Sequence, residues 1–255
     1  RSSAASDVYK RQELGYAESD PTNDVEGYDA AYKAVILSQF GFGATIDFDD
    51  VSHKGITNIS TDDVAVAQEL GYVIKLVGDV REVESGISAE VSPTFLPKNH
   101  PLASVNDVMN AVFVESIGIG ESMYYGPGAG QKPTATSVLA DIIRIARRLS
   151  DGNVGKPFNE FRRDLPLANP ADVKSNYYFA LDTPDEKGKI LHLSEIFNSE
   201  DISFEQVLQQ KANGTTARIV VITHAMSKTQ LKAVTEKLEA AEDFTVVNTL
   251  KVLSN

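Results

Sequence analysis

The C-terminal third of the chain alternates between strand-like and helix-like segments in an order that few folds accommodate. Apolar and β-branched runs predict four strands, over residues 177–181, 204–210, 217–223 and 244–252. Two helices are predicted between them, one over residues 190–197 and one that begins at a capping box of Ser227 and Gln230. The order β-α-β-β-α-β is that of the ferredoxin-like split unit. We therefore predict a ferredoxin-like domain over residues 175–255.

The preceding stretch, residues 13–150, also mixes helical and strand-like segments. Asp24 is a predicted N-cap for a helix that is closed by Gly41 and Gly43 and carries four apolar residues inward: Val25, Ala31, Val35 and Ile36. Thr61 or Asp62 is a predicted N-cap for a shorter helix. The other predicted elements are strands over 72–80, 87–93 and 110–116 and a long helix over 134–149, which follows Pro133. This pattern predicts an α+β fold in which a mixed sheet is covered by helices.

Two stretches of different composition flank these regions. Residues 1–12 are polar and lack periodicity, so they are either a foreign leader or a disordered native N-terminus. Residues 151–174 are rich in Pro, Gly and Asn and are typical of an interdomain linker. We predict two domains, over 13–150 and 175–255, joined by this linker.

Composition excludes several classes of function. A net charge of −12 argues against nucleic acid as a partner, since phosphate binding needs a basic surface. The chain has no cysteine and no apolar run of the ~20 residues that a membrane-spanning helix needs. Its four histidines lack ligand spacing, so no metal site is predicted. We expect a cytoplasmic, metal-free protein that binds small molecules.

Acidic side chains gather near the start of the chain, ahead of a lysine: Glu18, Asp20, Asp24, Glu26 and Asp29, with Lys33 beyond them. Asp29 and Lys33 are four residues apart, so on a helix they share a face. One interpretation is a solvated ion pair worth about a few tenths of a kcal/mol. The other is a site in which several carboxylates bind an amino acid's ammonium group beside a proton donor.

The segment LGYAESDPTNDVEGYDAAYK, residues 14–33, resembles the substrate-site signature of homoserine dehydrogenases. The resemblance continues through HKGI (53–56), ELGYVIKLVG (69–78), HPLA (100–103) and GPGAGQKPTA (126–135). It implies that Lys33 is the catalytic proton donor, with Asp29 beside it. It also implies a set of substrate-binding residues: Gly15, Tyr16, Glu18, Thr22, Asp24 and Asp29.

The glycine-rich segment GPGAG has two interpretations. By composition it is a tight turn before a helix, since Gln131 stands where the third glycine of G-x-G-x-x-G would fall. The resemblance implies instead that Gly128 and Gly130 lie beside a nicotinamide cofactor, NADP or NAD. No G-x-G-x-x-G follows a strand in this sequence. The family places its nucleotide-binding domain before the matched region, so these 255 residues are expected to be inactive without it.

The C-terminal domain resembles the ACT family of amino-acid-sensing modules, with DEKGKI at residues 185–190 in the position of the family's effector-binding turn. Gly188 is kept, but Lys187 replaces a proline and Lys189 an apolar residue. The resemblance implies an effector site around Asp185, Gly188 and Ile190, with threonine as a feedback inhibitor, and a homo-oligomer. A dimerisation or packing domain without a ligand is the alternative.

Together these resemblances imply an enzyme that reduces L-aspartate 4-semialdehyde to L-homoserine with NAD(P)H, in threonine, methionine and isoleucine biosynthesis. The alternative from another class is a stand-alone amino-acid-binding regulatory module without catalytic activity. In that case the acidic segment at residues 18–33 would survive only as a pocket for an amino acid.

Overall fold

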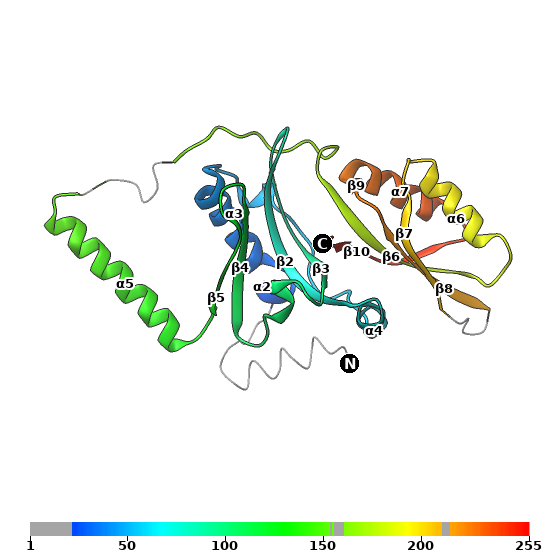
Figure 1. The fold of residues 1–255 in the computed structure, drawn as a ribbon, viewed down its shortest axis with the longest axis horizontal. Helices are drawn as coiled ribbons and strands as arrows, with labels where there is room; N and C mark the ends of the chain where they lie inside the picture. The colour runs from blue at the N-terminus through cyan, green and yellow to red at the C-terminus, as the bar shows by residue number, and fades with distance from the viewer. Residues whose placement is uncertain (1–21, 154, 156–160, 211–214, 255) are drawn as a thin grey trace. The chain divides into compact units, whose positions relative to one another are not determined.

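The computed structural model describes residues 22–153, 155, 161–210 and 215–254 (Figure 1). The described residues divide into two compact units, and each is described by itself. The main unit contains residues 22–97 and 163–254, and the hairpin–helix unit contains the described residues between 98 and 162. Within the described ranges, no helix is both long and apolar enough to cross a membrane.

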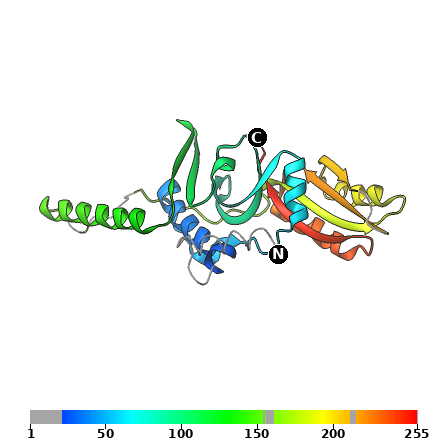
Figure 2. The same cartoon turned by 90° about the horizontal axis from the view of Figure 1, so that it is seen from below.

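The main unit is a mixed sheet with helices packed on both of its faces. In chain order its elements are α2 (Thr22–Val25), α3 (Tyr28–Phe42), the 3-10 turn η1 (Phe48–Asp50), β1 (Ser52–His53), α4 (Thr61–Glu69), β2 (Tyr72–Val83), β3 (Gly86–Pro97), β6 (Lys174–Pro184), α6 (Lys189–Asn198), β7 (Phe204–Gln209), β8 (Thr216–Thr223), β9 (Met226–Ser227), α7 (Lys228–Ala240) and β10 (Thr245–Val252). The strand order is β1-β3-β10-β6-β8-β7, with β2 paired to β3 and β9 to β6. Strands β6, β8 and β10 run side by side in both views (Figures 1 and 2). The predicted α+β fold with a mixed sheet is confirmed.

Strand β3 connects the two ends of this sheet. One of its edges pairs with β2 along the whole length of both strands, antiparallel. Its other edge pairs in parallel first with β1, at Glu90 and Val91, and then with β10, at Thr94 and Phe95. Because β10 also pairs with β6, the N-terminal and C-terminal segments of the chain share one sheet.

Residues 174–252, called here the C-terminal module, contain every element predicted for them. The order β6-α6-β7-β8-α7-β10 and the strand order β10-β6-β8-β7 give the predicted ferredoxin-like arrangement. Strand β6 is longer than predicted, and buried side chains such as Phe179 and Leu181 pack against α6 and α7. Whether the module is a separate domain stays a prediction, as does the linker over residues 151–174. The second half of that linker lies along β3, where Ile87 exchanges backbone hydrogen bonds of 2.9 Å with Pro166 and Ala168.

The N-terminal helix begins later than predicted. Asp24 lies inside the four-residue α2 and is not the N-cap of a long helix. The chain turns at Gly27, whose φ of 82° is left-handed, and α3 starts at Tyr28 and ends at Gly43 as expected. A Cβ on residue 27 would also lie 3.3 Å from Val91, so only glycine fits this turn easily.

Two further predictions about helices need correction. The cap of α4 is Ser60, not Thr61 or Asp62, because the Ser60 side chain accepts a hydrogen bond from the backbone of Asp63. On α3, Ala31 is buried as expected, whereas Ile36 is about half exposed. At 100° per residue, Ile36 projects from the side of α3 opposite the buried stripe of Ala31, Ala34 and Ser38.

The hairpin–helix unit consists of the 3-10 turn η2 (Pro101–Ser104), the hairpin β4 (Met109–Ser116) and β5 (Gly120–Pro127), and α5 (Gln131–Ser150). The predicted strand and long helix are present. Helix α5 has no buried residue, and its apolar side chains are 44–58% exposed: Val138, Leu139, Ile142, Ile143, Ile145 and Leu149. An apolar stripe of this length is typical of a helix that packs against another surface.

A buried group of charges joins the two ends of the main sheet. Lys251 of β10 contacts Asp79 of β2 at 2.5 Å and also Glu90 of β3, and Lys228 at the start of α7 lies 2.6 Å from Glu90. Burial by itself raises the pKa of Glu90, but the two ammonium groups outweigh it and lower this pKa to about 2. The carboxylate of Glu90 therefore stabilises the fold only while it is ionised.

Replacing Glu90 should remove part of the acid sensitivity of the fold. The lowered pKa contributes stability above the ordinary value of 4.5, and this is lost as the pH falls toward about 2. At pH 7 we expect Glu90→Gln to lower the free energy of unfolding by about 3 kcal/mol, because Lys228 loses its carboxylate partner and the buried Lys251 keeps only Asp79. Urea unfolding from pH 7 to pH 2 should show this difference shrinking below pH 4.5, with the exposed Glu239→Gln as control. A difference that does not change with pH would contradict this assignment.

Candidate active site

Helix α3 carries the two residues predicted to be catalytic. Asp29 lies in its first turn and Lys33 one turn later, and Lys33 Nζ lies 2.5 Å from Asp29 Oδ2. Both side chains are about half exposed, at 49% and 52%. The helix itself is fixed, since Ala31 and Ala34 pack against Ala89 and other buried residues. A rigid helix thus presents an accessible ammonium–carboxylate pair.

The turn between α2 and α3 adjoins the other described residues that were predicted to bind substrate. Thr22 and Asp24 are exposed in α2, just before Gly27. The segment after β1 holds this turn, because the backbone N–H of Ile56 donates to the carbonyl of Val25 at 2.9 Å. The side chains of Thr22 and Asp24 therefore belong to the same exposed region of the chain as the first turns of α3.

Aromatic rings support the start of α3. Tyr28 and His53 have ring centroids 4.9 Å apart, and Tyr32 stacks on Phe48 at 4.5 Å. These contacts connect α3 to η1 and β1.

Three predicted substrate residues, Gly15, Tyr16 and Glu18, lie outside the described residues, so their roles stay predictions.

The glycine-rich loop lies in the hairpin–helix unit. A Cβ on residue 128 would collide with the side chain of Asn110, which would have to shift to admit any residue other than glycine. Gly130 has a φ of 124° and is the N-cap of α5, without a side-chain cap. The first backbone N–H groups of α5 are therefore available to an anionic ligand. This fits a contact with a dinucleotide, but in the described residues no strand leads into a G-x-G-x-x-G turn that would hold one.

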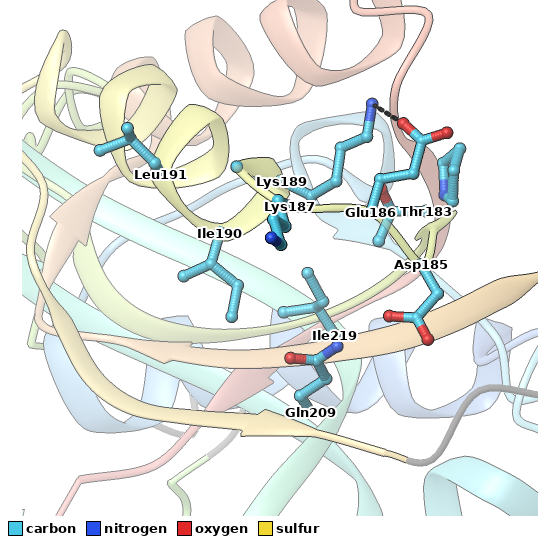
Figure 3. A pocket seen from close by; sticks show the side chains of 11 residues that line it. Thr183, Asp185, Glu186, Lys187, Lys189, Ile190, Leu191, Gln209 and Ile219 are labelled. Carbon is cyan, nitrogen blue, oxygen red and sulfur yellow. Dashed lines mark ion pairs between the residues drawn. The ribbon is translucent and has the colours of Figure 1, made fainter.

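The predicted effector residues meet at one cavity of about 290 Å³ in the C-terminal module (Figure 3). Asp185 and Gly188 line it just before α6, together with Ile190 of α6, Ile219 of β8 and Gln209 of β7. Figure 3 shows the carboxylate of Asp185 and the amide of Gln209 at this opening.

Lys187 and Lys189, which depart from the ACT pattern, also line this cavity. Lys189 turns to Asp243, where its Nζ lies 2.5 Å from Oδ1, and to Glu186 at 3.4 Å. The hydrogen bond that Lys189 donates to Asp243 is the largest cause that raises the pKa of Lys189, although burial opposes it. Lys189 is thus held by carboxylates of the module itself.

Sequence reasoning missed the residues that hold the α2–α3 turn. Lys54 belongs to HKGI, which the sequence analysis noted without assigning a role to it, and its Nζ donates to Thr249 O at 2.9 Å. Thr57 donates to Glu26 Oε1 at 3.3 Å. Only the position of Lys54 next to a glycine pointed to a close approach there.

Comparison with known proteins places the chain in a family. The family model described as homoserine dehydrogenase matches residues 2–143. The homoserine dehydrogenase of Lactococcus lactis is 61% identical over 96% of this chain and 58% of its own length. That of Bacillus subtilis is 38% identical over 91% of this chain and 54% of its own length. The chain thus spans little more than half the length of these relatives.

Solved structures agree with the sequence comparisons. A homoserine dehydrogenase from Thiobacillus denitrificans matches 97% of this chain and 57% of its own, with a TM-score of 0.88 and 33% identity. The S. aureus homoserine dehydrogenase at pH 6.5 matches 96% of this chain and 57% of its own, with a TM-score of 0.71 and 30% identity. The family match, the relatives and the Asp29–Lys33 pair on α3 lead to one conclusion: the chain belongs to the homoserine dehydrogenase family.

Proposed function

We propose that the enzyme containing these residues interconverts L-aspartate 4-semialdehyde and L-homoserine with NADP or NAD. The observation that carries this proposal is the exposed Asp29–Lys33 pair on a rigid helix, in a chain of this family. An ordinary surface ion pair contributes little to stability, so stability alone does not explain it. The pathways we propose are threonine, methionine and isoleucine synthesis, in the cytoplasm.

Lys33 is the proton donor in this proposal. Reduction of the aldehyde leaves negative charge on its oxygen, and the Nζ of Lys33 stabilises that oxygen and protonates it. Asp29, one helical turn away, holds the ammonium group in place through the 2.5 Å contact. Asp24 and Thr22, together with Gly15, Tyr16 and Glu18, would bind the amino and carboxylate groups of the substrate. In the reverse direction Lys33 takes the hydroxyl proton of homoserine.

A nicotinamide cofactor, when bound, supplies the hydride for the reduction. Gly130 and the N-terminus of α5 are the residues of this chain that would contact it, with Gly128 keeping the loop close to Asn110. The main dinucleotide contacts would come from a part of the enzyme beyond these residues, since the relatives are longer and the sequence lacks a G-x-G-x-x-G after a strand.

We also propose that this additional part covers α5. Its apolar stripe, which includes Ile142 and Ile145, is more than half exposed at those positions. Leaving such a stripe in water is unfavourable by roughly 25 cal/mol per Å² of apolar surface. The relatives have about two fifths of their length outside the matched region, enough for a domain.

Loss of Lys33 should slow the reaction strongly without unfolding the protein. In a full-length homoserine dehydrogenase carrying these residues, we expect Lys33→Ala to lower kcat by about 10²–10⁴-fold, as expected for a general acid. Asp29→Asn should lower kcat less, because the proton donor remains. Lys232→Ala, at an exposed position of α7, serves as the matched control. The measurement is NAD(P)H oxidation with aspartate semialdehyde, and a Lys33→Ala enzyme within about tenfold of wild type would exclude this role.

The cavity in the C-terminal module is proposed to bind L-threonine as a feedback inhibitor, as in an ACT module. The groups around the cavity match those of an amino acid. The carboxylate of Asp185 would bind the ammonium group, and the N-terminus of α6, which has no side-chain cap, would bind the carboxylate. Ile190 and Ile219 provide an apolar wall for a small side chain. Strand β7, at the edge of the sheet, offers a surface through which copies of the chain could pair into a homo-oligomer.

Calorimetric titration with L-threonine tests the effector site. We expect binding by the wild-type chain and an affinity at least about tenfold weaker in Asp185→Ala, because the ammonium group loses its charged partner. Asp172→Asn, in an exposed loop of the main unit, is the matched control. Equal affinity in wild type and Asp185→Ala, or no binding at millimolar threonine, would argue for a packing module without a ligand.

A further inference from the structure

Strand β10 takes the place of β1 along the edge of β3. Strand β1 ends at His53, and the backbone N–H of Lys54 continues the ladder by donating to Val91 O at 2.8 Å. Beyond that point the edge of β3 pairs with β10, from Thr94 onward. The segment after β1 must therefore leave the sheet where the C-terminal module enters it.

Lys54 spans this junction with its side chain. Its Nζ donates to Thr249 O at 2.9 Å and to Asn248 Oδ1 at 3.3 Å, and both acceptors belong to β10. Burial lowers the pKa of Lys54, while the nearby carboxylate of Asp63 opposes this effect. Although Lys54 as a whole is exposed, its ammonium group is thus held by the C-terminal module.

The acceptor on β10 is itself firmly placed. Asn248 is buried and donates to Asp63 Oδ2 at 3.0 Å and to Asn58 O at 3.1 Å. Asp63 also accepts a hydrogen bond of 2.9 Å from Tyr178 of β6. Burial raises the pKa of Asp63, but hydrogen bonds from Ser60, Asn248 and Tyr178 outweigh it and hold this pKa below its usual range.

The residues that follow Lys54 hold the α2–α3 turn. A Cβ on Gly55 would collide with the backbone of Val25 and Glu26, so the two segments are in close contact. Ile56 donates its N–H to Val25 O at 2.9 Å, and Thr57 donates to the Glu26 side chain. A displacement of residues 54–57 would therefore move the turn that leads into α3.

We infer that Lys54 is a positioning residue through which β10 of the C-terminal module holds the α2–α3 turn, and with it Asp24, Asp29 and Lys33. The chain of contacts runs from Asn248 and Thr249 to the side chain of Lys54. It continues along the backbone to Ile56, whose N–H donates to the carbonyl of Val25. The C-terminal module would thus limit the motion of α3 and of the turn before it through the side chain of Lys54. This inference rests on the proposed role of α3 in substrate binding.

Hydrogen exchange measured on this chain tests the link without requiring catalysis. In Lys54→Met, which keeps the length of the side chain but loses both hydrogen bonds, amides of residues 22–34 should exchange about fivefold faster. Amides of β6 and β8 should be unchanged, Lys54→Arg should restore slow exchange, and Lys232→Met is the matched control. Unchanged exchange in residues 22–34, or acceleration throughout the sheet, would overturn the inference.

Kinetics in a full-length homoserine dehydrogenase carrying these residues provides the second measurement. Because the chemistry at Lys33 stays intact, Lys54→Met should raise the KM for homoserine about fivefold and change kcat by less than about twofold. An unchanged KM would overturn the inference. If Lys33→Ala were instead fully active, the proposed catalytic role would fail while the exchange result still stood.

Discussion

The parallel pairing of β3 with β10 is the contact on which the rest of the main unit depends. It joins residues 94–95 to residues 251–252, far apart in the sequence. The strands of the C-terminal module thereby share a sheet with β3, against which α3 packs. The pairing itself is short, so the buried contacts of Lys251 with Glu90 and Asp79 reinforce it. Buried pairs of this kind cost desolvation, and breaking one partner costs more than the pair contributes.

The β3–β10 junction explains how the Asp29–Lys33 pair, proposed to be catalytic, can be both exposed and ordered. Asp79 and Glu90 face each other across the β2–β3 ladder, and the neighbouring pair, Gly78 and Val91, faces α3. The charges thus lie on one face of the same two strands that support the helix on the other. Helix α3 packs on two strands, β2 and β3, that the contacts of Lys251 hold on their opposite face. Lys33 can therefore remain accessible to a substrate without losing its position.

Local signals in the sequence predicted most of the elements. Capping residues, glycine stops and strand periodicity located α6, α7 and the strands of the C-terminal module. They failed at Asp24, where a side chain suited to capping precedes a glycine turn that a helical pattern does not reveal. They could not reveal the β3–β10 pairing or the role of Lys54, since these depend on contacts between distant residues. The resemblance selected Lys33 and Asp29, which spacing alone left as an ordinary ion pair.

Native-state hydrogen exchange in increasing denaturant tests most directly whether residues 22–97 and the C-terminal module form one cooperative unit. Amides of β3 and of β8, on either side of β10, should share one opening free energy and merge into a single unfolding transition. Exchange from β2 and β3 while β6 and β8 remain protected would contradict this account. In that case the module would be an independent domain, and its contacts at β10 would not govern the substrate helix.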